Sequence, residues 1–328
     1  MTTFDDGLYQ YGGMPVGGGM LPLMGGSGKV FFVDPANGSD GNSGLSPEQA
    51  LDTVGAAYAK CIDKSGDTIY LLNDGNSSGS SREATIPLTW AHDNVHLVGL
   101  CAPVGMSQRS RITPVSTAAL TAAPVIDVTG NGNIFANLQI AHYGANTDAI
   151  ATQGVAVSGS QNYFHNVHVV GIVNAHTGDE AAAVDLLIDG GAENLFKHCT
   201  IGVDTIARTA ANASVELTTS AARNVFEDCL FPMVTDAADP LFIKADGTAD
   251  LDRFVQFKGC TFINAVESTS TSLTSATSVA NDAAGVVLFS GGCQIIGADD
   301  VAIADNGNVW VDGVGGAATG ALSIVATQ

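Results

Sequence analysis

The chain has 328 residues, 45% of them hydrophobic, which is enough for one large domain with a buried core. Thirty-three acidic residues against twelve basic ones give a formal net charge of −21, which argues against nucleic acid and anionic membranes as partners. Only 14% of the residues are charged and 39 are glycine, a composition that favours strands and turns over helices.

The cysteines and the first residues indicate where the protein folds. The cysteines form no CxxC pair, as is typical of reduced thiols in a cytoplasmic protein. They are Cys61, Cys101, Cys199, Cys229, Cys260 and Cys293. No basic region followed by an apolar run opens the chain, and no stretch reaches the roughly 18–20 apolar residues that cross a membrane. We therefore expect folding in a cytoplasm, without a signal peptide or membrane segment.

Residues 1–28 form a segment that cannot build a core, because it contains nine glycines and two prolines. Apolar side chains are nevertheless spread along it. They include Phe4, Leu8, Tyr9, Tyr11, Met14, Val16, Met20, Leu21 and Met24. One interpretation is a disordered tail. Flexible linkers are usually polar, however, so we expect an extended anchoring arm that docks on another subunit.

Residues 29–75 predict a cap made of a strand, a loop, a helix and a second strand. Ser46 suits the N-cap of the helix, Pro47 its first position, and Gln49 completes a capping box. The apolar face of the helix would contain Ala50, Val54, Ala57, Tyr58 and Cys61. Such a helix would cover the open end of a stack of strands.

The run FVDPANGSDGNSGLSPEQALDT and the following GDTIYLL, within residues 32–72, resemble the N-terminal part of pectate-lyase-like β-helix proteins. That family includes many phage tailspikes and phage virion proteins. The resemblance implies a right-handed parallel β-helix but no single function, because this fold carries lyases, hydrolases and structural proteins. Residues 1–28 also resemble, loosely, the segments by which phage capsid-decorating or tail proteins attach to the particle.

One short motif recurs through residues 76–297. It occurs as NIFANLQI, NYFHNVHV, NLFKHCTI and NVFEDCLF, followed by the variants VQFKGCTF and VLFSGGCQ. The phenylalanines lie 29, 32, 30, 31 and 32 residues apart, at Phe135, Phe164, Phe196, Phe226, Phe257 and Phe289. A degenerate copy starting at Asn94 places His96 in the Phe position. A unit of this length is too long for a leucine-rich repeat and lacks the Trp-Asp signature of a propeller blade.

Within each copy, alternating apolar residues lie on both sides of one residue type that tolerates a left-handed backbone. These bend positions are Asn137, Asn166, His198, Asp228, Gly259 and Gly291. A further strand precedes each copy, so about 30 residues form one coil of a right-handed parallel β-helix. The Phe column and the column of Cys199, Cys229 and Cys260 should be inward ladders, the cysteines reduced and free of metal.

Residues 298–328 contain three strand-like segments that should close the far end, where Trp310 could instead contact another subunit.

No group of residues predicts a catalytic or metal site. The candidate acids Asp127, Asp185 and Glu216 lie on different coils, and none of the six arginines shares a column with several acids. His165 and His168 lie on one coil and are interpreted as surface or trimer-contact residues. The loop from Asp34 to Asn42 is rich in oxygen ligands but lacks the EF-hand order. We therefore expect no catalytic residue, metal, cofactor or enzyme activity.

Together these features favour a structural protein of a phage virion, most simply a capsid decoration (cement) protein that folds in the host cytoplasm. We expect a homotrimer, as the family resemblance implies, whose arm docks on the major capsid protein or another virion subunit. The alternative is a tailspike or tail-fibre protein that binds or cleaves a host surface polysaccharide. A bacterial β-helix enzyme is a further alternative. Six of the 13 phenylalanines belong to the inner ladder, which argues mildly against a depolymerase.

Overall fold

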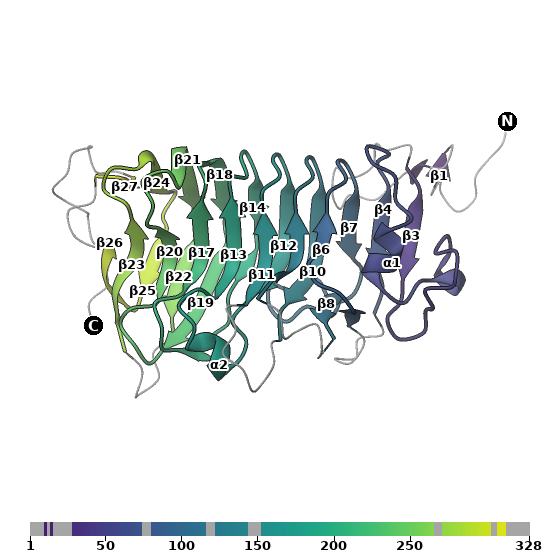
Figure 1. Ribbon diagram of the computed structural model, residues 1–328, viewed down its shortest axis with the longest axis horizontal. Helices are drawn as coiled ribbons and strands as arrows, with labels where there is room; N and C mark the ends of the chain where they lie inside the picture. The colour runs from purple at the N-terminus through teal and green to yellow at the C-terminus, as the bar shows by residue number, and fades with distance from the viewer. Residues whose placement is uncertain are drawn as a thin grey trace.

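The computed structural model describes residues 10–11, 14–15, 28–73, 80–115, 122–143, 152–265, 271–302 and 307–312. The protein is a parallel β-helix of about 7 turns with ~31 residues per coil, as the repeat predicts (Figure 1). Strands of successive coils pair in parallel, so each coil places its side chains one rung, about 4.8 Å, from those of the next. This stacking converts sequence repeats into straight rows of residues.

Each coil contributes to two sheets, here named sheet I and sheet II. Sheet I has a bend, and its first segment contains β3 (Val30–Val33), β4 (Thr68–Leu71), β7 (His96–Gly99), β10 (Ile134–Ala141), β12 (Tyr163–Val170), β14 (Leu195–Lys197), β18 (Ala221–Glu227), β21 (Leu251–Lys258), β24 (Ala284–Ser290) and β27 (Val309–Val311). The long strands β10 and β12 continue past the bend. There they meet β5 (Ser81–Glu83), β8 (Arg111–Pro114), β15 (Thr200–Ile201), β16 (Ala207–Arg208), β19 (Leu230–Thr235), β22 (Thr261–Asn264) and β25 (Gln294–Ile296).

Sheet II forms another side of the solenoid. Its order is β6 (Leu88–Trp90), β9 (Pro124–Val128), β11 (Gln153–Val157), β13 (Val184–Asp189), β17 (Ala213–Thr218), β20 (Leu241–Ala245), β23 (Leu273–Val279) and β26 (Ala298–Ala302). Tight turns lead from sheet II into sheet I, and longer loops, one carrying α2 (Ala175–Gly178), lead back. No helix in the described ranges is long and apolar enough to cross a membrane.

The bend of sheet I falls where the sequence predicts it. All six predicted bend residues have positive φ: Asn137 57°, Asn166 51°, His198 54°, Asp228 53°, Gly259 63° and Gly291 65°. Asn, Asp and Gly are the residue types that adopt this left-handed conformation at least cost. One such residue per coil is therefore enough to turn the strand.

Inside the solenoid the phenylalanines form one continuous stack. Successive ring centroids, from Phe135 to Phe289, lie 4.8, 4.5, 4.6, 4.6 and 5.6 Å apart. Next to this stack lie Cys199, Cys229, Cys260 and Cys293, which are buried free thiols. Burial raises the pKa of the Cys229 thiol, whose Sγ donates to the carbonyl of Phe196 at 3.3 Å. In the described ranges, no group of three or more His, Cys, Asp or Glu could hold a metal ion.

A second internal ladder consists of the asparagines that open the repeat, whose role the sequence analysis did not predict. Asn133, Asn162, Asn194 and Asn224 are buried. The side-chain oxygen of Asn194 accepts the backbone N–H of Asn162 at 2.8 Å, and its amide donates to the carbonyl of Gly159 at 3.1 Å. Each turn thus gains partners for backbone groups that would otherwise be buried without them.

The early copy of the repeat is displaced by one residue from its predicted register. Leu97, and not His96, pairs with Phe135 and occupies the Phe column. The reason is that Val95 takes the place of the ladder asparagine, its N–H donating to Asn133 Oδ1 at 2.8 Å. His96 falls one position outside the core row and accepts the N–H of Ile134 at 3.2 Å.

The cap differs from the single helix that the sequence predicts. It contains a 3-10 turn, η1 (Pro47–Gln49), and a separate helix, α1 (Val54–Tyr58), capped by Thr53. Between them the chain is extended, because Leu51 is fully buried and pairs with Val33. Asp40 fixes this extension, since its Oδ1 accepts the N–H of both Asp52 and Thr53 at 2.9 Å.

The two ends of the chain are described in part. A short antiparallel pair joins β1 (Gln10–Tyr11) to β2 (Met14–Pro15). The other apolar residues predicted to anchor the arm, Phe4, Leu8, Tyr9, Val16, Met20, Leu21 and Met24, lie outside the described residues. At the far end, β26 and β27 continue the two sheets, while the last predicted strand, in 321–325, lies outside the described residues.

Candidate functional site

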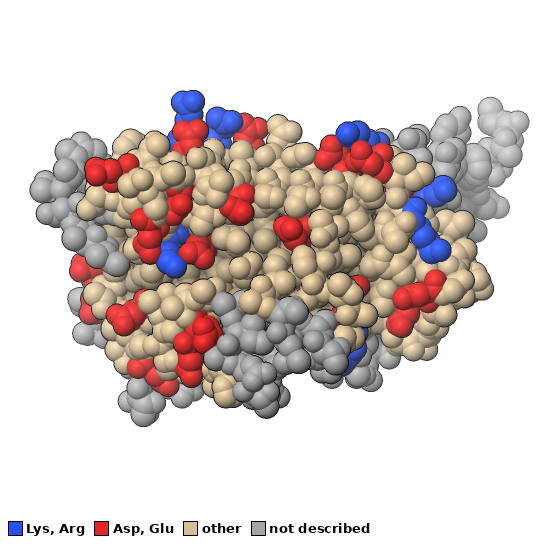
Figure 2. Space-filling view, viewed as in Figure 1, with Lys and Arg blue, Asp and Glu red and all other residues tan. Residues whose placement is uncertain are grey.

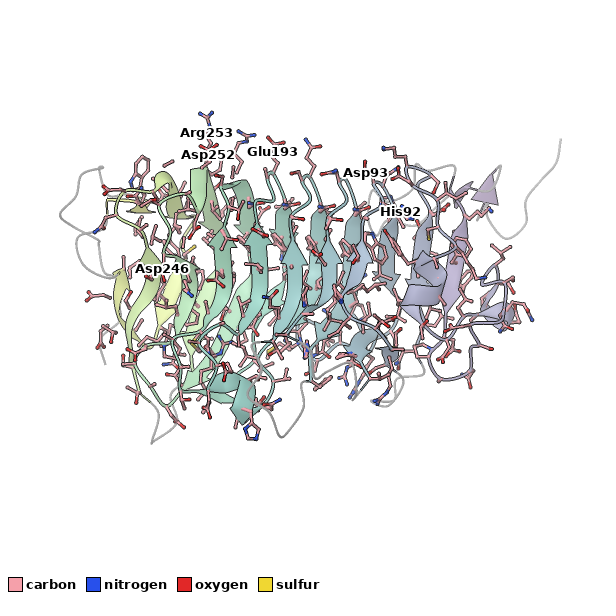
Figure 3. All side chains as sticks on the ribbon, viewed as in Figure 1. His92, Asp93, Glu193, Asp246, Asp252 and Arg253 are labelled. Carbon is pink, nitrogen blue, oxygen red and sulfur yellow. The ribbon has the colours of Figure 1, made fainter. Side chains whose placement is uncertain are left out.

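The outer face of sheet II carries a row of six residues one rung apart, four of which are polar. The register runs from Asp127 through Ala156, Leu187, Glu216 and Lys244 to Ser278. Figure 3 labels Asp246 at mid-height near the C-terminal end of the face turned toward the viewer, and Figure 2 shows acidic side chains on that face. Parallel strands therefore bring together residues that are far apart in the sequence.

The centre of this row is an ion pair, Glu216 with Lys244, at 3.0 Å. Both side chains are about three-quarters buried, at 25% and 23% exposure. Two hydroxyl–carboxylate pairs accompany it: Thr218 donates to Asp189 at 3.0 Å, and Ser278 donates to Asp246. We name these six residues the sheet II patch: Asp189, Glu216, Thr218, Lys244, Asp246 and Ser278. It offers carboxylates, an ammonium group and hydroxyls, all of which can bond to sugar hydroxyls.

Asp127 lies on the same row as Glu216, which sequence spacing alone did not show. Partial burial raises the pKa of its carboxyl, and the negative charge of Asp189 raises it further. Ala156 and Leu187 separate the two acids, so they lie three rungs, about 14 Å, apart. Carboxyl pairs that cleave one glycosidic bond are about 5–9.5 Å apart, so Asp127 and Glu216 cannot act on the same bond in this way.

Asp185, the third candidate acid, is a buried structural residue. It pairs with Arg208 at 2.5 Å, and both side chains are fully buried. The other carboxylate oxygen accepts the N–H groups of Gly171 at 2.9 Å and Ile172 at 3.1 Å. Arg208 also donates to Ser214 at 3.3 Å. This pair ties the long loops between the sheets to sheet II and leaves Asp185 no contact with solvent.

His168 is buried, so its prediction as a surface or trimer-contact residue is wrong. The loop of residues 100–110 crosses two later coils, and its Ser107 N–H donates to His168 Nδ1 at 3.1 Å. Gln139 Nε2 lies 3.2 Å from the same nitrogen, and His168 Nε2 donates to the carbonyl of Gly202 at 3.0 Å. Because Nδ1 accepts, the ring is neutral, and burial lowers its pKa.

His165 lies on the outer face of sheet I and is partly exposed. Its Nδ1 is 3.0 Å from the hydroxyl of Tyr163, and its ring centroid is 5.6 Å from that of His198 on the next coil. The two predicted histidines therefore have different environments, and they do not form a site together.

Charged residues also follow the rim formed by the tight turns, where Figure 3 labels Asp93, Glu193, Asp252 and Arg253. Arg223 pairs with Glu193 at 2.5 Å, with side chains 46% and 39% exposed. The N–H of Asn131 lowers the pKa of Asp93. Such exposed pairs contribute little to stability and are interpreted as a solvated edge.

The oxygen-rich loop of the cap is a set of turns. Asp34 accepts the N–H groups of Ala36 and Asn37 at 3.0 and 3.2 Å. Asp40 accepts from the residues that lead into α1. Both carboxylates thus serve the backbone of the cap.

No protein-family model matches the sequence, and no curated protein is similar to it. Solved structures with TM-scores above 0.5 show the same fold. Pectin methylesterase PemA from Erwinia chrysanthemi is 14% identical, with a TM-score of 0.56, over 88% of this chain and 90% of that one. Pectate lyase Pel9A is 13% identical, with a TM-score of 0.51, over 87% of this chain and 78% of that one. ORF18 of Geobacillus virus E2 is 16% identical, with a TM-score of 0.47, over 76% and 49%.

These structures contradict the expectation that the chain is not an enzyme, because the pectin methylesterase and the pectate lyase are enzymes on the same solenoid. That expectation depended on finding no catalytic pattern in the sequence. In a parallel β-helix, however, outward residues of several coils make up one site, so sequence spacing cannot exclude it. At these identities the likeness shows the fold alone.

Proposed function

We propose that this chain binds a polysaccharide along the outer face of sheet II, centred on the sheet II patch. The observation that carries the proposal is the straight row from Glu216 through Lys244 to Ser278, which presents a hydrogen-bonding side chain at each rung. A linear sugar polymer can lie along such a row and meet one polar group after another. The similar structures include proteins named for pectin and pectate, so the same solenoid occurs in proteins that act on polysaccharides.

The charge of the face indicates which sugars it favours. Asp127, Asp189, Glu216 and Asp246 lie on or beside the row, and Lys244 is already paired with Glu216. A polymer of uronic acids would meet like charge along most of this length. Neutral sugars instead supply hydroxyl donors to the carboxylates. We therefore propose a neutral polysaccharide, such as the host surface glycan that a tailspike or tail fibre would bind.

The test compares two ion pairs of the same chemistry on different faces. The first double variant, Glu216→Gln with Lys244→Met, removes the ion pair on sheet II. The control, Lys197→Met with Glu227→Gln, removes a similar ion pair on sheet I, whose charged atoms are 3.4 Å apart. Calorimetric titration with neutral hexasaccharides should show binding at least tenfold weaker for the sheet II variant and unchanged for the sheet I variant. Polygalacturonate should bind more weakly than the neutral sugars to the wild type.

The same incubations, assayed for new reducing ends and unsaturated products, show whether bound sugar is also cleaved. Equal affinity of both double variants for the neutral hexasaccharides would overturn the proposal. So would tighter binding of polygalacturonate to the unmodified protein.

A second proposal concerns attachment to a virion. We infer from the apolar residues spread through glycine-rich residues 1–28 that this segment anchors the chain to a phage particle, as a capsid decoration protein docked on the major capsid protein or another virion subunit. The test adds the full chain, or a chain lacking residues 1–27, to capsids depleted of it. Regular projections seen by electron microscopy only with the full chain support decoration. Binding confined to the tail, or none, would contradict it.

A further inference from the structure

The outer face of sheet I, in its first segment, carries a row of seven side chains, of which six are apolar or aromatic and one, Gln256, is polar. Residues in this row pair one rung apart, in the order Ile134, Tyr163, Leu195, Val225, Gln256, Leu288 and Trp310. Every member is at least partly exposed, and Trp310 is 52% exposed. We name these seven residues the sheet I row. Nearer the cap, the aromatic rings of Phe32 and Tyr70 pack 5.9 Å apart on the same sheet.

Charged residues lie directly beside the sheet I row. The row next to the sheet I row contains Lys197, Glu227 and Lys258, in register on successive rungs. Glu227 pairs with both lysines, at 3.4 and 3.2 Å. These three residues have a formal charge of +1 in a chain with a formal charge of −21. Monomeric proteins seldom leave a continuous apolar strip in water, and such strips mark contact surfaces.

We propose that the sheet I row is the surface through which copies of this chain pack side by side. A second copy presents the same rung spacing, about 4.8 Å, so two solenoids can stay in register along their whole length. A partner with another repeat would lose this match after a few rungs. The alternating lysine and glutamate row is also self-complementary, because a shift of one rung places Lys197 or Lys258 opposite Glu227 of another copy.

The length of the sheet I row determines how wide such a contact must be. From Ile134 to Trp310 the sheet I row spans six rung intervals, or about 29 Å. A stable interface buries about 800 Å² per partner, so a contact of this length must be about 28 Å wide and extend to the rows beside the sheet I row.

The experiment places a charge at the middle of the sheet I row. Leu195→Lys with Val225→Lys introduces two cations at positions that are partly exposed, so the fold should tolerate them. Leu187→Lys, at an equally outward position of sheet II, is the matched control. Mass is measured by light scattering after size-exclusion chromatography over a range of concentrations, and circular dichroism checks that each variant is folded.

The wild type and Leu187→Lys should have a mass of two or more copies, and the double variant should dissociate at a concentration at least tenfold higher. Tryptophan fluorescence gives a second readout, because Trp310 is exposed and the other tryptophan, Trp90, is buried. Association should shift the emission to shorter wavelength. A wild type that is still monomeric at a concentration 100 times a dissociation constant of about 1 μM would overturn the proposal. A double variant that associates like the wild type would also overturn it.

Discussion

The inner and outer sides of the same strands differ in how strongly packing restricts their residue types. In β18, the ring of Phe226 points inward and stacks at 4.6 Å on the rings before and after it, whereas its neighbours Val225 and Glu227 point outward. The inward position holds phenylalanine in six successive coils, while the outward positions change from coil to coil. The repeat therefore records how the core packs, and the residues that differ between coils are the ones available for function.

The largest effect should come from opening the inner stack. Phe226→Ala removes a ring with stacked partners on both sides, and such substitutions cost about 3–5 kcal/mol in free energy of unfolding. Val225→Ala, one residue away on the outer side, should cost less than about 1 kcal/mol. Urea unfolding followed by circular dichroism measures both. Equal losses would mean that the inner and outer sides do not differ as described.

A similar contrast applies to charge. Arg208→Met leaves the carboxylate of Asp185 buried without its partner, which should cost about 3–5 kcal/mol. Arg223→Met breaks the exposed pair with Glu193 and should leave the unfolding midpoint unchanged. Thermal unfolding of the two variants side by side gives the comparison. An unaffected Arg208→Met protein would show that the buried pair does not hold the long loops in place.

The asparagine ladder should have an intermediate effect. Asn194→Ala removes the acceptor for the buried N–H of Asn162, and an unsatisfied buried group costs about 1–3 kcal/mol. Asn131→Ala is the control, since Asn131 is an exposed turn residue. Amide hydrogen exchange should show faster exchange at Asn162 only in the first variant. Unchanged protection at Asn162 would contradict the role assigned to the ladder.

The smallest effect concerns pH. Burial lowers the pKa of His168 below the value of about 6.5 expected in the unfolded chain. The contribution of the neutral ring to stability is therefore fully present above about pH 6.5 and is lost as pH falls toward and through the folded pKa. Stability of the wild type should fall between pH 7 and 5, and His168→Gln should flatten this slope. The exposed His176→Gln variant should keep it. A slope that persists in His168→Gln would assign the pH dependence to other groups.

The sequence predicts what is local and repeated. The six bends, the Phe stack and the Cys column follow from residue types at fixed spacing, because each coil must turn at the same place. The displaced copy at Leu97 could not be predicted, since Val95 replaces the asparagine that would mark the register. Nor could the burial of His168, which depends on a loop from a coil more than 50 residues earlier. The rows of outward residues could not be predicted either, because they depend on which residues of neighbouring strands pair. The spacing of the repeat gives that pairing only for the core residues.

The most direct test of polysaccharide binding on the outer face of sheet II is a crystal structure of the protein soaked with a neutral hexasaccharide. We expect sugar density along sheet II, with hydroxyl groups bonded to Glu216 and Lys244. Sugar bound on sheet I or along the rim of turns, with the sheet II patch left to solvent, would contradict it.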